Sequence, residues 1–218
     1  MVNSSVQATE VIGLKTGIVG LGLIGGSFAR AYSATGHEVY ALEKNPQVFD
    51  AAVREQAVQE ELTKENAGQC DLILICVYPQ AAVSFLRDFG PCFGSRPLVI
   101  DCCGTKKRMT EAGMAAAKEF GFTFLGGHPM AGTQYSGFEH SRADLFRDAP
   151  MVLVPPNPED QALVKRARKL KGLPEVTVSA EQAAVNMAAY REQQFDILAQ
   201  TVRESLDMEK VYAILRGE

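Results

Sequence analysis

The stretch of sequence that decides the fold is KTGIVGLGLIGGSFARAYSAT, residues 15–35. Its first part, Lys15–Gly20, predicts a short buried strand, and Leu23–Thr35 predicts a helix that ends at Gly36. The spacing GxGxxG, residues 20–25, lies between the two. A glycine-rich turn in this position is typical of a βαβ unit that binds a nucleotide.

Each glycine of this turn has a predicted task. Gly20 allows a tight turn, Gly22 lets a pyrophosphate approach the backbone, and Gly25 lets the helix pack closely on the strand. The N–H groups at the start of the helix, including those of Leu23 and Ile24, are expected to bind the phosphates. A plain turn without a ligand is the alternative. The position between strand and helix favours the nucleotide site.

An acidic residue follows at the distance that such a site needs. Glu43 stands eighteen positions after Gly25, at the end of the predicted strand Glu38–Leu42. A carboxylate there binds the ribose 2′-hydroxyl and repels a 2′-phosphate, so we expect NAD rather than NADP as cofactor. The neighbouring Lys44 weakens this preference, and a solvated loop charge is the alternative role for Glu43.

The chain alternates predicted strands and helices up to residue 178. This order predicts an α/β fold with a doubly wound, mostly parallel Rossmann-type sheet, and a cofactor-binding domain over residues 1–178. The further predicted strands are Leu72–Val77, Leu98–Cys102, Phe122–Leu125, Pro150–Val154 and Val176–Val178, and the further predicted helices are Pro46–Glu55, Pro79–Phe89, Lys106–Phe120 and Glu159–Leu170.

The composition changes at residue 179. Residues 179–218 contain one glycine and no proline, and their apolar positions keep a helical period. We expect a long helix from Ser179 to about Ser205 and a second amphipathic helix from Met208, which together form a short helical tail. Such a helix needs a partner surface, so we expect a homodimer formed through this tail. A tail that lies along its own domain is the alternative.

The composition also excludes several classes of protein. The net charge is -4 and no basic stripe occurs, so no nucleic-acid partner is expected. The longest apolar runs are too short to cross a membrane, and residues 1–15 lack the features of a signal peptide. The five cysteines lack metal-ligand spacing, so no metal site is predicted, and we expect a reduced, cytoplasmic protein.

Residues 126–137, GGHPMAGTQYSG, place one histidine in a glycine-lined turn. A neutral imidazole at His128 would accept a proton from a hydroxyl while hydride leaves the same carbon, which is typical of a dehydrogenase. A turn histidine that bonds only to backbone is the alternative. His37 and His140 lie in less suitable settings.

A second segment, DCCGTKK at residues 101–107, follows a predicted strand. Ligands of open α/β sheets bind at such strand ends. Thr105 is a candidate helix N-cap and a candidate substrate contact, and the two roles are compatible. Lys106 or Lys107 could attract an anionic substrate, and simple solvation is the alternative for both.

Three segments resemble the prephenate and arogenate dehydrogenases of tyrosine biosynthesis. They are GIVGLGLIGGSFARA (17–31), DCCGTK (101–106) and GGHPMAGTQYSGFEHSRADLF (126–146). The likeness covers about Thr16 to Val178. It implies oxidation of the ring hydroxyl of prephenate, a dianion, with NAD(P), and decarboxylation to 4-hydroxyphenylpyruvate.

The resemblance also implies residue roles. His128 corresponds to the family's base, and Thr105 corresponds to a hydroxyl residue, usually serine, that orients base and substrate. Gln134 stands where the family commonly has an acidic residue near the substrate. Lys106 completes our set of candidate substrate contacts.

The C-terminal part departs from the family pattern. Family members carry a helical dimerisation domain with an SHLPH-like stretch and an arginine that binds a substrate carboxylate. Residues 179–218 resemble a truncated form without that stretch, and Arg191 and Arg142 are the candidates to replace the arginine. We expect a prephenate dehydrogenase-like enzyme. The alternatives are an NAD-binding remnant without prephenate turnover and a dehydrogenase of a different substrate, such as arogenate or a smaller carbonyl compound.

Overall fold

The computed structural model describes residues 13–147, 149, 151–157, 160–171 and 175–177. Within them, eight strands form one sheet in the order β3-β2-β1-β4-β5-β6-β7-β8. Neighbouring strands are parallel except β6 and β7, which run antiparallel. The strands are β1 (Lys15–Val19), β2 (Glu38–Leu42), β3 (Glu60–Glu61), β4 (Leu72–Ile75), β5 (Leu98–Asp101), β6 (Thr123–Pro129), β7 (Met151–Val154) and β8 (Glu175–Thr177).

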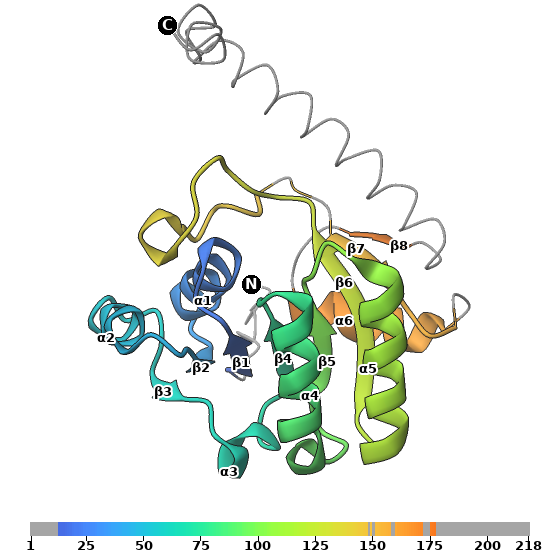
Figure 1. The fold of residues 1–218 in the computed structure, drawn as a ribbon. Coiled ribbons are helices and arrows are strands. Elements are labelled where there is room, and N and C mark those ends of the chain that lie inside the picture. The colour runs from blue at the N-terminus through green and yellow to red at the C-terminus, as the bar shows by residue number, and fades with distance from the viewer. Residues whose placement is uncertain (1–12, 148, 150, 158–159, 172–174, 178–218) are drawn as a thin grey trace, which may run out of the picture.

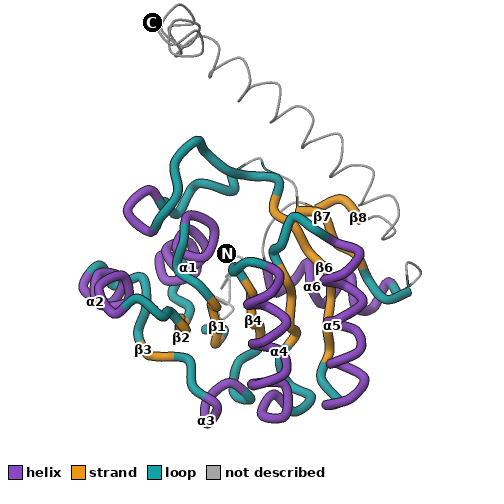
Figure 2. The backbone as a smooth tube through the Cα atoms, in the orientation of Figure 1, coloured by secondary structure: helices purple, strands orange, loops and turns teal. Residues whose placement is uncertain are grey.

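Helices cover both faces of this sheet (Figures 1 and 2). They are α1 (Leu23–Ala34), α2 (Pro46–Arg54), α3 (Lys64–Ala67), α4 (Pro79–Phe93), α5 (Lys106–Phe120) and α6 (Gln161–Lys171), with a short 3-10 helix η1 (Phe138–His140). One apolar core joins the sheet to α1, α2 and α6, and a second joins it to α3, α4 and α5. The two cores form because successive strand side chains point to opposite faces.

The predicted fold class is therefore confirmed. The chain is a doubly wound, mostly parallel α/β domain of the Rossmann type. The strand order reverses between β1 and β4, because β1 is followed by β2 on one side and β4 pairs with its other side. The carboxyl ends of these two strands form the topological switch point, where ligands of such sheets bind.

Three features differ from the sequence-based expectation: strand β3, helix α3 and the length of β6. Strand β3 and helix α3 were missed, since each has only two to four residues. The predicted strand Phe122–Leu125 continues to Pro129, and β7 runs antiparallel to it.

The predicted tail helices of residues 179–218 lie outside the described residues, so the division at residue 178 stays a prediction. Within the described part, no helix is long and apolar enough to cross a membrane.

The segment that follows β6 returns across the molecule to α1, as Figure 2 shows in teal and purple. The hydroxyl of Ser27 accepts a hydrogen bond of 3.0 Å from the backbone N–H of Arg142. The rings of Phe28 and Phe146 stack with centroids 4.1 Å apart. A side chain at Gly26 would clash with Phe138, 2.7 Å away, so glycine is required for this packing. Helix α1 thus anchors the β6–β7 connection beside the switch point.

Candidate active site

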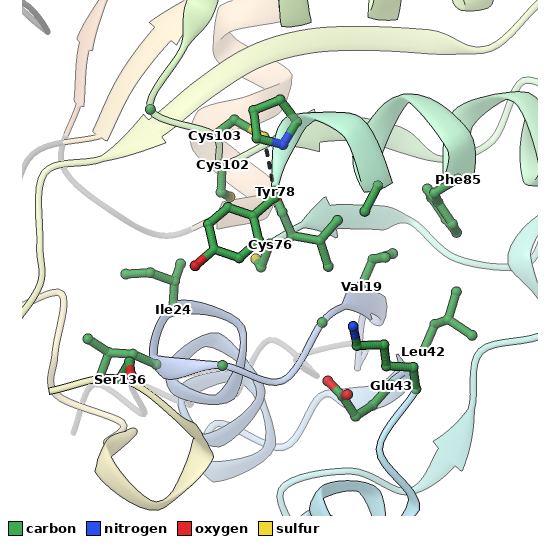
Figure 3. A pocket seen from close by; sticks show the side chains of 18 of the residues that line it. Val19, Ile24, Leu42, Glu43, Cys76, Tyr78, Phe85, Cys102, Cys103 and Ser136 are labelled. Carbon is green, nitrogen blue, oxygen red and sulfur yellow. Dashed lines mark hydrogen bonds between the residues drawn. The ribbon is translucent and has the colours of Figure 1, made fainter.

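A cavity of about 650 Å³ opens at the switch point (Figure 3). Its walls come from the segments that follow β1, β2, β4 and β5, together with Ser136 and Gly137 of the β6–β7 connection. A cavity of this size and position suits a small molecule or cofactor. Among its lining residues are five of the six predicted cofactor contacts, Gly20, Gly22, Leu23, Ile24 and Glu43. Cys103 and Gly104 of the segment 101–107, together with Cys76 and Tyr78, also line it.

The glycine turn has the geometry that a bound pyrophosphate requires. Gly20 has φ +86, a conformation that other residues rarely adopt. A Cβ at Gly25 would lie 1.9 Å from the carbonyl oxygen of Gly20, so Gly25 allows the close contact of helix and turn. A Cβ at Gly22 would meet no protein atom within 4 Å. Gly22 is therefore not needed for internal packing, and the space beside it suits a ligand that approaches the backbone.

Glu43 lies beside the glycine turn, directly after β2 (Figure 3). Its carboxylate accepts hydrogen bonds from the backbone N–H of Leu21 at 2.8 Å and of Asn45 at 2.9 Å. These bonds fix an acidic group at the edge of the cavity, half-buried and next to the glycine turn. Lys44 also lines the cavity. The carboxylate is thus placed where a ribose hydroxyl of a dinucleotide would donate a hydrogen bond to it.

Tyr78 is a wall residue that the sequence analysis missed. It precedes Pro79, the first residue of α4, and 87% of its surface is exposed although it is a large aromatic residue. An exposed aromatic ring at the mouth of a cavity offers a flat surface for a planar ligand group. The sequence could have indicated Tyr78, because the pair Tyr78-Pro79 follows the most apolar predicted strand. The carboxyl end of such a strand lies at the ligand-binding edge of the sheet.

The cysteines at the cavity behave as small apolar residues. Cys102 and Cys103 are buried and Cys76 is half-buried. The adjacent Cys76 side chain and burial raise the pKa of the Cys102 thiol, and burial raises the pKa of Cys103 to about 12. These two thiols therefore stay protonated near neutral pH, which makes them poor nucleophiles.

His128 lies in strand β6, not in the expected glycine-lined turn. The preceding Gly126 and Gly127 are paired with β7 residues in an ordinary strand register. A Cβ at Gly127 would come within 2.6 Å of Ile100 and 2.8 Å of Met151. These glycines are thus needed for close packing between strands. The strand places the histidine at the carboxyl edge of the sheet, beside the segment that follows β5.

The imidazole of His128 is half-buried and bonds to the backbone of the segment that follows β5. Its Nδ1 lies 3.2 Å from the carbonyl oxygen of Cys102. A carbonyl only accepts hydrogen bonds, so Nδ1 carries the proton in the neutral ring and Nε2 keeps its lone pair. Burial lowers the pKa of His128, and the nearby Lys106 ammonium adds to this effect. A neutral imidazole with an accepting Nε2 is the form that a general base needs.

The neighbouring candidates take different positions. Thr105 is the residue before α5, as predicted, but its exposed side chain makes no capping hydrogen bond. Its hydroxyl is therefore not engaged at the helix end. A side chain at Gly104 would lie 3.8 Å from the His128 ring, and Gly104 lines the cavity. Neither Thr105 nor His128 lines the cavity. Both lie next to Gly104, the lining residue that follows β5, so they stand beside the cavity rather than in its wall.

Lys106 contradicts both expectations for that residue. Its side chain is completely buried and its ammonium group pairs with the carboxylate of Asp101, also completely buried. It is thus neither solvated nor able in this arrangement to touch a substrate. Sequence spacing gave no sign of this, because a lysine in the first turn of a helix is usually exposed.

The remaining predicted contacts stand farther from the cavity. Gln134 is exposed in the β6–β7 connection, two residues before Ser136 of the cavity wall. The Arg142 side chain is exposed and lies 3.4 Å from the carboxylate of Asp144. Arg191 lies outside the described residues. The structure therefore brings together the cofactor candidates and places His128 and Thr105 beside them, while Gln134 and Arg142 are set apart.

The family model of the prephenate dehydrogenase nucleotide-binding domain matches residues 28–178. The chain belongs to this family. The predicted resemblance is therefore confirmed, and the glycine turn at residues 20–25 lies two residues before the matched region. The family assignment agrees with the observed sheet, its switch-point cavity and the histidine at the end of β6.

Individual family members resemble this chain to a moderate degree. The prephenate dehydrogenase of Lactococcus lactis subsp. cremoris is 28% identical over 153 residues, which are 68% of this chain and 43% of that protein. The crystal structure of Synechocystis arogenate dehydrogenase has a TM-score of 0.68 and 28% identity, over 78% of this chain and 61% of that chain.

A prephenate dehydrogenase from A. aeolicus, solved in complex with hydroxyphenyl propionate and NAD+, shares the fold. Its TM-score is 0.68 at 22% identity, over 80% of this chain and 63% of that chain. The chain spans 41% to 48% of the length of the curated relatives it matches. The similarity therefore concerns the nucleotide-binding part of these dehydrogenases.

Proposed function

We propose that this protein is an NAD-dependent dehydrogenase that oxidises prephenate to 4-hydroxyphenylpyruvate with loss of carbon dioxide. The observation that carries the proposal is the neutral His128, whose Nδ1 faces the Cys102 carbonyl at 3.2 Å and whose Nε2 is left to accept a proton. This group stands beside a cavity with the glycine turn of a dinucleotide site. The family assignment supports the same reaction.

The cofactor contacts follow from the walls of the cavity. The turn at Gly20, Gly22 and Gly25, with the backbone of Leu23 and Ile24, would hold the pyrophosphate of NAD. Glu43 would hold the adenosine ribose and disfavour a 2′-phosphate, so NAD is expected in preference to NADP. Bound NAD supplies a hydride acceptor.

The side chains of His128 and Thr105 would carry out proton transfer and substrate orientation. His128 Nε2 takes the proton of the ring hydroxyl as hydride leaves the same carbon, so that a carbonyl forms and the ring loses its carboxylate as carbon dioxide. The Thr105 hydroxyl, which is not used for helix capping, would orient the substrate hydroxyl toward the histidine. Gln134 remains a candidate substrate contact in the adjacent connection.

Arogenate is the second candidate substrate. The 28% identity with Synechocystis arogenate dehydrogenase favours it as an alternative, because that structure is as similar as the prephenate dehydrogenases. The two substrates differ in the group on their side chain, a keto group in prephenate and an amino group in arogenate. A homodimer formed through residues 179–218 and a cytoplasmic location stay predictions.

The test is formation of NADH by the purified protein, followed at 340 nm with prephenate and, separately, with arogenate. Prephenate-dependent turnover that disappears without substrate supports the proposal. Turnover with arogenate alone would change the substrate assignment. If the folded protein binds NAD and neither substrate yields NADH, the proposal is wrong and the chain is a nucleotide-binding protein without this activity.

A further inference from the structure

We propose that the buried Asp101–Lys106 pair is a positioning device for His128. The proposal rests on the proposed function, because it assigns His128 as the base. It gives Lys106 a role different from a substrate contact. The two side chains fix the two peptide units that decide where the His128 ring lies.

The first peptide unit carries His128 itself. Strand β5 ends at Asp101, whose register partner is Gly126, so β6 continues beyond its neighbour. The backbone groups of Gly127 therefore lack a strand partner on this side. The Asp101 carboxylate accepts the N–H of Gly127 at 3.3 Å, and the Lys106 ammonium donates to the Gly127 carbonyl. Since the peptide unit is planar, fixing this carbonyl also fixes the backbone nitrogen of His128.

The second peptide unit binds the histidine ring. The Cys102 carbonyl, which accepts from His128 Nδ1, belongs to the same planar unit as the N–H of Cys103. That N–H donates to the Asp101 carboxylate at 3.0 Å. Asp101 therefore holds the acceptor of the ring, and Lys106 holds the backbone that bears the ring. The salt bridge between Asp101 and Lys106 joins the two supports.

Burial makes this arrangement rigid. Both side chains have 0% exposed surface, so water does not compete for their hydrogen bonds. A buried ion pair is a weak source of stability, because desolvation offsets much of the attraction between the charges. A pair that mainly stabilises the fold would thus be replaceable by neutral residues. A pair that positions His128 would not be replaceable without a loss of turnover.

The test compares two double variants with the wild-type chain. Asp101→Asn with Lys106→Met removes both charges and the donor to the Gly127 carbonyl. We expect kcat to fall by about 10²-fold, the scale of an ångström-sized misplacement of a reacting group, while NAD affinity stays unchanged. Asp101→Asn with Lys106→Gln keeps neutral hydrogen-bonding groups, so it should restore part of kcat and lose about tenfold.

The matched control lies at the other end of the sheet. Asp71 accepts the backbone N–H of Lys15 at 3.0 Å and pairs with Arg96 at 3.0 Å, the same kinds of bond as in the Asp101 cluster. Asp71→Asn with Arg96→Met should change the thermal midpoint of unfolding and leave kcat unchanged. This control shows whether a loss of stability alone lowers kcat, so it separates destabilisation from mispositioning of His128.

A second readout does not depend on turnover. NMR of the imidazole nitrogens should show His128 protonated at Nδ1 in the wild-type chain, and a shift toward the Nε2-protonated tautomer in the Met-containing variant. If that variant fails to fold, the Gln-containing variant decides alone, through kcat and through the same tautomer shift. Unchanged kcat and an unchanged tautomer in a folded variant would overturn the proposal.

The two proposals can fail separately. If the wild-type chain forms no NADH but the double variant shifts the His128 tautomer, the positioning role stands and the proposed function fails. If His128→Ala abolishes turnover but the double variants keep wild-type kcat and tautomer, the function stands and the positioning role fails.

Discussion

The two sides of the site are held by different means. On the β1–β2 side, the cavity wall is formed by backbone, two glycines, Gly20 and Gly22, and a half-buried carboxylate, Glu43. On the β5–β6 side, His128 is held by a backbone carbonyl and stands next to a fully buried ion pair. The first side suits a ligand that binds to backbone N–H groups, and the second suits a side chain that needs one fixed orientation. Cofactor binding and proton transfer should therefore respond to different substitutions.

Removal of the imidazole should give the largest effect and tests this separation directly. His128→Ala is expected to lower kcat for prephenate oxidation by about 10² to 10⁴-fold, the range for loss of a general base. NAD affinity, measured by fluorescence titration, should stay the same because His128 does not line the cavity. His37→Ala is the matched control, since His37 accepts a bond from Leu14 away from the site. Near-normal turnover of the His128 variant would contradict its assignment as base.

The glycine turn should show the opposite behaviour. Gly22→Ala is expected to lower NAD affinity by about 10- to 100-fold, the equivalent of a lost charged hydrogen bond. The thermal midpoint should change little, because the new Cβ meets no protein atom within 4 Å. Gly25→Ala places its Cβ 1.9 Å from a backbone oxygen and should reduce both stability and affinity. If Gly22→Ala leaves NAD affinity unchanged, the space at Gly22 has no role in binding.

The β1–β2 side could be predicted because its features are local. Residues 15–35 contain the strand, turn and helix in order, and the close contact that requires Gly25 is with Gly20, five positions away. Glu43 was found by its distance from Gly25 along the chain. The alternation of strands and helices, read in the same way, was sufficient for the sheet and its two helical layers.

The β5–β6 side could not be predicted because it depends on strand register. Lys106 is buried only because β5 ends at Asp101 while β6 continues to Pro129, which brings Gly127 beside both side chains. No sequence pattern indicates that one strand extends beyond the end of its neighbour in the sheet. The glycines before His128 suggested a turn, yet they are required by the close approach of Ile100 and Met151. Contacts between residues distant in sequence decided both outcomes.

A smaller effect on cofactor binding is expected from substitution of Glu43, the carboxylate directly after β2. Glu43→Gln should lower NAD affinity by about tenfold, through loss of a charged hydrogen bond, and should narrow the preference for NAD over NADP because the repulsion of a 2′-phosphate disappears. Binding of both cofactors is measured by calorimetry. Glu38→Gln, at the amino end of the same strand, serves as control, because Glu38 is exposed and bonds to Lys15 and Tyr40, which do not line the cavity. If the wild-type and variant chains prefer NAD over NADP by the same factor, Glu43 does not contact the ribose.

The pH dependence should give the smallest effect and concerns the histidine side alone. Burial lowers the pKa of His128 from the ordinary imidazole value of about 6.5. As the pH falls through this lowered pKa, the imidazole gains a proton at Nε2 and can no longer act as base. The acid limb of kcat/KM should therefore have its midpoint below about pH 6.5, while NAD affinity stays level across the same range. An NMR titration of the His128 ring should give the same midpoint. A kinetic midpoint at or above 6.5, or one that differs from the ring titration, would mean that another group controls the reaction and that the buried side of the site does not set the protonation state of its base.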